Sequence, residues 1–238
     1  MDTLVMIPTY NEAGNITELL SALLKIEPAV HVLVIDDQSP DGTGELVQRL
    51  AEREPRVHLL SRSGPRGRGL AGIAGYNWAL AQNAQSIIEM DADLSHRPEF
   101  VPHIIAALQR YQVVIGSRYV PGGQDRRRGA TRRLISKLAN AYTRFILGLP
   151  IRDCTSGFRG YRAEVLRGIG AERLTVWGPA VLSDVLWRIK LKRFSFGEIP
   201  IQFDDRQRGT STLTTAILVE GLWNVLRLRL RVGPGDVD

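Results

Sequence analysis

The chain has 238 residues, of which 44 % are hydrophobic and 24 % charged, so it can form one large domain with a sizeable core and does not resemble a disordered segment. Its formal net charge of +6 suits an anionic partner, such as a membrane surface, a nucleic acid or a phosphorylated substrate, but charge alone favours an ordinary basic soluble protein. The single cysteine, Cys154, excludes an internal disulfide. Because no run of about 18 uncharged apolar residues occurs and the first residues lack a basic leader, we expect neither a membrane-spanning helix nor a signal peptide.

Short apolar runs alternate with helical patterns through the first half of the chain. The apolar runs predict strands over Leu4–Ile7, Val30–Ile35, Val57–Leu60, Ser86–Met90 and Val113–Gly116. Apolar residues spaced three and four apart predict helices over Asn15–Ile26, Gly44–Arg53, Leu70–Ala84 and Glu99–Tyr111. This alternation is typical of βαβ units, so the predicted fold class is α/β, with a mainly parallel twisted sheet flanked by helices.

The second half of the chain has fewer strand patterns and longer helices. Tyr119–Gly129 is rich in Gly and Arg and predicts a loop, whereas Phe194–Ile199 predicts a strand. Helices are expected over Arg132–Leu147, Ala180–Lys190 and Leu213–Leu230. The first of these helices has an apolar side and a polar side; the polar side consists of Arg133, Lys137, Asn140 and Arg144. Because the chain shows no repeat and no clear linker, we expect a single domain over residues 1–238.

Acidic residues follow two of the predicted strands. Asp37 comes after Val30–Ile35, and Asp91 and Asp93 come after Ser86–Met90. In open sheets of this kind, ligands bind at the carboxyl ends of the strands, so these acids are expected at one edge. Two carboxylates separated by one small residue can bind a hard cation such as Mg²⁺, which also binds substrate phosphates. The alternative for Asp91 and Asp93 is a turn with solvated acids, and the alternative for Asp37 is a turn at a helix N-terminus.

Other candidates lie close to the same predicted edge. Tyr10 and Glu12 follow the first strand and could contact a base and ribose hydroxyls, although Glu12 could also be a favourable charge at a helix N-terminus. Asp41 is interpreted as a helix cap. The segment Arg66–Gly72 is basic and Gly-rich, but it is not a P-loop, and a loop entering a helix explains it better. Arg118 follows the strand Val113–Gly116.

Two further groups could bind phosphate. Arg132 and Ser136 lie four residues apart on one helix face, which suits a phosphate clamp, although a solvated polar face is the alternative. Arg206 lies in a polar loop that could close over a diphosphate or could be an ordinary charged loop. We assign no role to the four histidines, among which His96 adjoins the acidic motif, and we interpret Cys154 as a small buried residue.

Several segments together closely resemble the dolichol-phosphate (polyprenol-phosphate) mannose synthase group of family 2 glycosyltransferases. The segments run in the order found in the family and span about residues 3–212. They read IPTYNE, VIDDQSPDGT, MDADLSH, GSRYVPGG, RRLISKLAN, DCTSGFRGYRAEVL and EIPIQFDDR.

This resemblance implies a nucleotide-diphospho-sugar transferase (GT-A) fold and metal-dependent, inverting transfer of mannose from GDP-mannose to a polyprenyl phosphate. Asp91, Asp93 and Ser95 would hold Mg²⁺ or Mn²⁺, with Asp93 and Arg118 as the catalytic residues. Arg132 and Ser136 would hold the acceptor phosphate. The residues lining the donor site would be Pro8, Tyr10, Glu12, Ile35, Asp37, Asp91, Ala92, Asp93, Arg118 and Arg206.

The chain departs from the family pattern at Gln38, at Thr212 in place of a lysine, and at Leu182 and Asp184. The last two departures motivate an alternative donor, a UDP-sugar such as UDP-glucose. An alternative of another class is a basic module that binds nucleic acid, but the chain has no motif for it, so we expect no nucleic-acid partner.

The predicted last helix, Leu213–Leu230, groups polar residues on one face and leucines on the remainder. It could lie on a membrane surface, or it could pack on the domain or on a partner such as a membrane-anchoring subunit. We therefore expect a protein that works peripherally at the cytoplasmic face of a membrane.

Overall fold

The computed structural model describes residues 1–26, 28–174, 178, 180–205 and 215–237. The strands are β1 (Thr3–Thr9), β2 (His31–Asp36), β3 (Val57–Ser61), β4 (Ser86–Glu89), β5 (Val113–Ser117), β6 (Gln124–Asp125), β7 (Arg159–Arg162), β8 (Phe196–Pro200) and β9 (Gln202–Phe203). The α-helices are α1 (Ile16–Leu23), α2 (Thr43–Ala51), α3 (Arg68–Ala81), α4 (Val101–Leu108), α5 (Ala130–Leu147), α6 (Ala163–Gly168), α7 (Val181–Leu191) and α8 (Thr215–Arg231). Short 3₁₀ turns are η1 (Pro98–Phe100), η2 (Ala171–Arg173) and η3 (Pro234–Val237).

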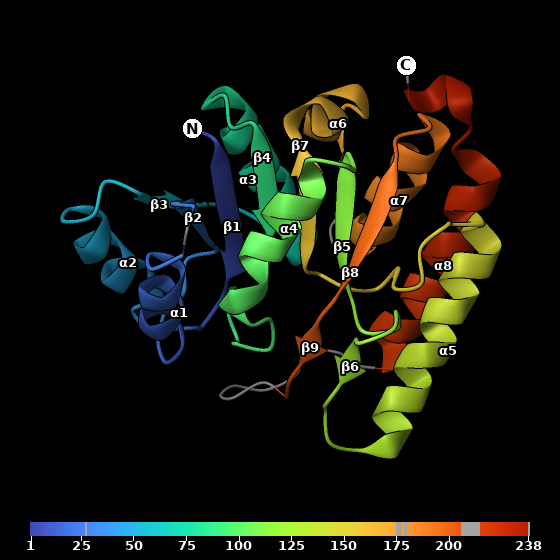
Figure 1. Cartoon of the computed structure of the whole chain (residues 1–238), viewed down its shortest axis with the longest axis horizontal. Coiled ribbons are helices and arrows are strands. Elements are labelled where there is room, and N and C mark those ends of the chain that lie inside the picture. The colour runs from blue at the N-terminus through green and yellow to red at the C-terminus, as the bar shows by residue number, and fades with distance from the viewer. Residues whose placement is uncertain (27, 175–177, 179, 206–214, 238) are drawn as a thin grey trace.

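The centre of the molecule is a seven-stranded sheet with the strand order β3-β2-β1-β4-β7-β5-β8, and helices cover both of its faces (Figure 1). Every pairing in this sheet is parallel except the two made by β7, which lies antiparallel between β4 and β5. The predicted α/β class is confirmed. The predicted strands and helices are present with their ends shifted by a few residues, and the predicted helix Glu99–Tyr111 is η1 followed by α4. Of the predicted helix Leu213–Leu230, the first two residues lie outside the described ranges, and the rest belongs to α8.

The strand β7 is the element of the large sheet that the sequence pattern did not predict. Its four residues read Arg-Gly-Tyr-Arg and lack the apolar alternation of the other strands. A Cβ atom on Gly160, in the middle of β7, would collide with Ile104 of α4. Glycine is therefore required here so that α4 can pack directly on this strand.

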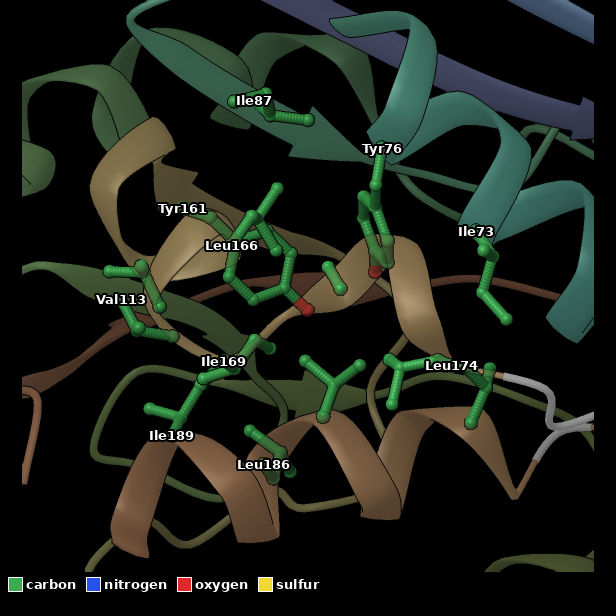
Figure 2. Close-up of a cluster of buried hydrophobic side chains, with 14 of the residues drawn as sticks. Ile73, Tyr76, Ile87, Val113, Tyr161, Leu166, Ile169, Leu174, Leu186 and Ile189 are labelled. Carbon is green, nitrogen blue, oxygen red and sulfur yellow. The ribbon is translucent and has the colours of Figure 1, made fainter. Parts of the chain in front are cut away.

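Each face of the sheet has its own hydrophobic core, because alternate strand residues point to opposite faces. On β1, Leu4 and Met6 belong to the core beneath α3, α6 and α7, whereas Val5 and Ile7 belong to the core beneath α1 and α4. Figure 2 shows part of the first core, to which these helices contribute Tyr76, Leu166 and Leu186. Both faces of the sheet are covered, so substrates can approach only at its edges.

A buried charge connects β7 to the helix that covers it. Arg159 is fully buried, and its guanidinium donates hydrogen bonds to the backbone carbonyls of Ser156 at 2.6 Å, Leu182 at 2.8 Å and Cys154 at 2.9 Å. Since these carbonyls belong to the loop just before β7 and to α7, the Arg159 side chain joins β7 and its preceding loop to a helix residue that lies 23 positions away in sequence.

Replacing Arg159 with Met should lower the free energy of unfolding by about 3 kcal/mol or more. Three carbonyls lose their donor, two of them in the buried residues Cys154 and Ser156, and an unsatisfied buried polar group costs about 1–3 kcal/mol. Urea denaturation of the variant and the wild type measures this difference. The exposed Arg110 provides the matched control, because Arg110→Met should change stability by less than about 0.5 kcal/mol. Equal stability of Arg159→Met and wild type would contradict this role.

Candidate active site

The strands β1, β2, β4 and β5 run in the same direction, and predicted site residues follow their ends at one edge of the sheet. Asp37 follows β2, Asp91 follows β4, and Arg118 follows β5. The strand β1, which leads into Tyr10, lies between β2 and β4. Adjacent strands are about 4.8 Å apart, so Asp37 and Asp91 are separated by roughly 10 Å across β1.

The start of α3 connects the acids of β2 and β4. The backbone N–H of Gly67 donates to Asp37 Oδ2 at 2.9 Å. The guanidinium of Arg68 pairs with Asp91 Oδ1 at 2.7 Å and with the buried Glu89 at 3.4 Å. Because Gly67 and Arg68 are adjacent residues, the structure brings Asp37 and Asp91 into one site.

The sequence of Arg66–Gly72 favours a plain loop that enters a helix, but in the structure this segment also contacts predicted site residues. Arg66 donates to the hydroxyl of Tyr10, and its guanidinium lies 4.7 Å from the centre of the Tyr10 ring. Arg62, which follows β3, pairs with Asp37. The sequence analysis did not predict that Arg62 and Arg68 pair with the acids of this site. A signal for them exists, because basic residues in a segment that leads into a helix can face acidic residues at the ends of neighbouring strands.

Asp93 is held in a tight local turn. Its side chain is buried, and its Oδ1 accepts hydrogen bonds from the backbone N–H of Ser95 at 3.1 Å and from Ser95 Oγ at 2.5 Å. Ser95 therefore lies beside Asp93. Asp91 is more accessible, with 35 % of its side chain exposed.

His96, to which the sequence assigns no role, positions this acidic motif. Its Nδ1 accepts a hydrogen bond from the backbone N–H of Asp91 at 3.1 Å, and its ring stacks on Phe158 with ring centres 5.1 Å apart. Burial lowers the pKa of His96, and the nearby carboxylates of Asp91 and Asp93 offset this only in part. The imidazole is therefore neutral at pH 7, which lets Nδ1 act as the acceptor.

The residues of this edge fit a hard divalent cation. Asp91 and Asp93 offer carboxylate oxygens, which Mg²⁺ and Mn²⁺ prefer as ligands. Among the described residues, no group of three or more His, Cys, Asp or Glu side chains is arranged to hold a metal. A cation at Asp91 and Asp93 would therefore have few protein ligands and would need substrate phosphates to complete its shell, as Mg²⁺ commonly does.

Arg118 lies at the predicted edge, but most of its donors are already engaged. Its Nε and Nη2 donate to the two carboxylate oxygens of Asp153 at 2.8 Å each, and Nη2 also donates to Thr155 at 2.7 Å. Burial alone would lower the pKa of Arg118, but Asp153 raises it above its ordinary value. Among the described residues Nη1 of Arg118 has no hydrogen-bond partner. Arg118 can therefore donate to a bound ligand through Nη1, although Asp153 already neutralises most of its charge.

The predicted acceptor clamp is described only in part. Arg132 and Ser136 both belong to α5, but the Arg132 side chain lies outside what the structure describes. Ser136 lies close to the hydroxyl of Tyr119, whose pKa is raised mainly by burial. Arg206, predicted to contact the donor, lies outside the described ranges.

The remaining predicted donor residues surround β1. Pro8 pairs in register with Ile35 of β2, whose side chain is fully buried in the core, so Ile35 supports the edge from beneath. Ala92 is buried between the two acids of its motif. The carboxylate of Glu12 accepts a hydrogen bond from Asn15 Nδ2 at 2.7 Å. Glu12 thus lies at the end of β1, beside the start of α1.

Known proteins resemble this chain over most of its length. The family model described as glycosyl transferase family 2 matches residues 4–170. Polyprenol monophosphomannose synthase of Mycolicibacterium smegmatis is 41 % identical over 231 residues, covering 96 % of this chain and 87 % of the relative. Undecaprenyl-phosphate mannosyltransferase of Micrococcus luteus is 39 % identical over 227 residues, covering 95 % of this chain and 93 % of the relative.

A solved structure shares the fold at low identity. Glucosyl-3-phosphoglycerate synthase from Mycobacterium tuberculosis, in complex with Mn²⁺, UDP-glucose and phosphoglyceric acid, aligns with a TM-score of 0.71 and 17 % identity, covering 96 % of this chain and 79 % of that one. The family match and the two relatives extend across the strands that carry the acidic edge. This chain therefore belongs to glycosyl transferase family 2, in the group of polyprenyl-phosphate mannose synthases, and is a glycosyltransferase with the GT-A fold.

Proposed function

We propose that this enzyme transfers mannose from GDP-mannose to a polyprenyl phosphate, with inversion at the anomeric carbon and with Mg²⁺ or Mn²⁺ bound. The observation that carries the proposal is the joint positioning of Asp37 and Asp91 by the start of α3, with Asp93 in the same motif. The two relatives are named for mannose transfer to lipid phosphates, which supports the choice of sugar and acceptor.

The donor nucleotide would lie across the end of β1. The ring of Tyr10, which is 41 % exposed, and the guanidinium of Arg66 form a flat, cationic surface on which a base can stack. The carboxylate of Asp37 is fixed by Gly67 and Arg62 and can accept hydrogen bonds from the base or the ribose. Glu12 adds a second acceptor beside the ribose position.

The diphosphate would lie over Asp91 and Asp93. A divalent cation there supplies positive charge that neutralises the leaving nucleoside diphosphate. Ser95 and His96 fix the carboxylate of Asp93 and the backbone of Asp91 respectively, so the motif is positioned before the donor arrives. Arg68 contributes a further positive charge at Asp91.

The acceptor is a phosphate monoester, which is already an anion near neutral pH. It needs positioning and partial neutralisation more than deprotonation. The open Nη1 of Arg118, with Arg132 and Ser136 of α5, would provide both. No helix among the described residues is long and apolar enough to cross a membrane. We therefore propose that the lipid is reached from the cytoplasmic surface of a membrane, with or without an anchoring subunit.

The departures that motivated a UDP-sugar donor have roles within α7 and its packing. The Leu182 side chain packs against the hydrophobic core beneath α7, and Asp184 pairs with Arg188 at 2.7 Å. The pKa of Asp184 is raised by its burial. Neither residue contacts the acids of the proposed donor site among the described contacts, so the structure gives no separate reason to favour UDP.

Replacing Asp93 with Asn should lower the rate of mannose transfer from GDP-mannose to polyprenyl phosphate by roughly a hundredfold or more, because one carboxylate charge for the cation is lost. Electron paramagnetic resonance of Mn²⁺ in the presence of GDP should show weaker binding. The control is Asp2→Asn, an exposed residue at the opposite edge of the sheet. Full activity of Asp93→Asn would remove the proposed role.

Thermal unfolding with different nucleotides tests the identity of the donor. A ligand at about 100 times its Kd that binds only the folded protein adds about 2.7 kcal/mol, which raises the Tm of a chain of this size by roughly 5–10 °C. With Mn²⁺ present, GDP and GDP-mannose should produce this shift at lower concentrations than UDP and UDP-glucose. The reverse order would favour the UDP-sugar alternative.

Replacing Asp153 with Asn should lower the free energy of unfolding at pH 7 by roughly 3 kcal/mol, because Arg118 stays buried without its counter-ion. Burial would raise the pKa of Asp153, but Arg118 outweighs this and holds the pKa below its ordinary value. The pair therefore stabilises the wild type above about pH 4, and this contribution is lost as pH falls through the folded-state pKa. Chemical denaturation at several pH values should show the two proteins converging below about pH 4, and a constant difference would contradict the ionised pair.

A further inference from the structure

Asp91 of the proposed metal site shares one guanidinium with a buried carboxylate. The guanidinium belongs to Arg68, the first residue of α3, and its Nη2 lies 2.7 Å from Asp91 Oδ1 and 3.4 Å from Glu89 Oε1. Burial would lower the pKa of Arg68, but Asp91 and Glu89 raise it above its ordinary value, so the side chain is charged at neutral pH. Arg68 is therefore a positive charge of the chain itself at the carboxylate that a divalent cation would bind.

The helix α3 does not by itself favour a cation at this position. The N-terminus of a helix carries a partial positive charge, which is unfavourable for an arginine in the first turn. The contact also needs room, since a Cβ on Gly157 would lie 2.7 Å from Arg68 Nη2 and 3.4 Å from Asp91 Oδ2. The Arg68–Asp91 pair therefore depends on the carboxylates that attract the arginine and on a glycine that leaves space for it.

The two carboxylates differ in how easily they can lose Arg68. Glu89 is buried, and its Oε2 accepts a hydrogen bond from the Tyr76 hydroxyl at 2.7 Å. Arg68 supplies the counter-ion of Glu89, and a buried charge without a counter-ion is costly. Asp91 is partly exposed, so water or another cation can replace Arg68 there. Arg68 can thus leave Asp91 while it keeps Glu89, whose Oε1 also lies 3.5 Å from Nη1.

Arg68 and a divalent cation compete for the same carboxylate. Two positive charges at Asp91 repel each other, so a cation that arrives alone has to displace Arg68. A nucleoside diphosphate over the same acids changes this balance, because its oxygens can accept hydrogen bonds from the displaced guanidinium. The diphosphate also supplies the ligands that a cation with few protein carboxylates needs.

We propose that Arg68 is a positioning residue that competes with the divalent cation for Asp91 and thereby couples metal binding to the sugar nucleotide. Without nucleotide, Arg68 holds Asp91 and weakens the binding of the cation. With nucleotide, Arg68 keeps Glu89 and turns toward the diphosphate, which leaves Asp91 to the cation. The inference rests on the proposed function, because it takes the cation and the diphosphate to lie at Asp91.

Binding of Mn²⁺ to the whole chain, measured from the electron paramagnetic resonance signal of the free ion, tests this role without any transfer reaction. The variant Arg68→Met/Glu89→Gln removes the guanidinium together with its buried partner, so the net charge stays the same. Without nucleotide it should bind Mn²⁺ about fivefold more tightly than wild type, which is the upper range for a partly exposed ion pair. GDP should strengthen Mn²⁺ binding about fivefold less in this variant than in wild type.

Gly157→Ala tests the same contact without removing any charge. The φ angle of Gly157 is one that alanine adopts, and the added methyl group should push Arg68 Nη2 away from Asp91. Mn²⁺ alone should bind roughly two- to fivefold more tightly. The matched control is Arg62→Met/Asp37→Asn, which removes another ion pair of the same edge. It should change the binding of Mn²⁺ alone less than about twofold, because Asp37 lies beyond the Debye length of about 8 Å.

Unchanged or weaker binding of Mn²⁺ alone by both Arg68→Met/Glu89→Gln and Gly157→Ala would overturn the inference, and so would an equal gain in the control. The proposed function fails separately. If wild type bound no Mn²⁺ even with GDP, the metal-dependent function would be wrong. If wild type bound Mn²⁺ with GDP but neither variant bound Mn²⁺ alone more tightly, only the role of Arg68 would be wrong.

Discussion

Carboxylates buried at one edge of a mainly parallel sheet are the constraint on which this structure depends. Asp153 is fully buried, Glu89 is 1 % exposed and Asp93 is 6 % exposed. Buried charges are costly unless each is paired or hydrogen-bonded. The chain meets this requirement with arginines and local donors, so the same contacts that let the edge fold also set the orientation of its carboxylates.

The antiparallel strand β7 brings a distant segment to this edge. Because β7 runs against its neighbours, its beginning lies where β4 and β5 end, and the residues before it reach the acids. A Cβ on Gly157 would lie 2.7 Å from Arg68 Nη2 and 3.4 Å from Asp91 Oδ2. Thr155, in the same loop, contacts Arg118. One reversed strand therefore connects the donor half of the site to Arg118.

The positive charge of the chain is divided between two uses. Arg62, Arg68 and Arg118 are paired with carboxylates at the edge of the sheet and preserve the geometry there. The cations along α5, such as Lys137 and Arg144, line a cavity in which the acidic lining residue Asp125 is already paired with Arg127. The net charge of +6 therefore does not act as a uniform field, because its effect depends on which arginines are neutralised.

The sequence by itself determined the α/β class, the parallel strands and the placement of Asp37, Asp91 and Arg118 after strands that end at one edge. Apolar periodicity is a local property, and parallel pairing then brings the strand ends together. Only the tertiary structure decided the partners, namely Arg68 for Asp91, Asp153 for Arg118 and the neutral His96 behind the acidic motif. These pairings arise from how loops and helices pack around β7, a reversed strand of four residues. The spacing of residues along the chain does not encode which arginine will pair with which carboxylate once water is excluded.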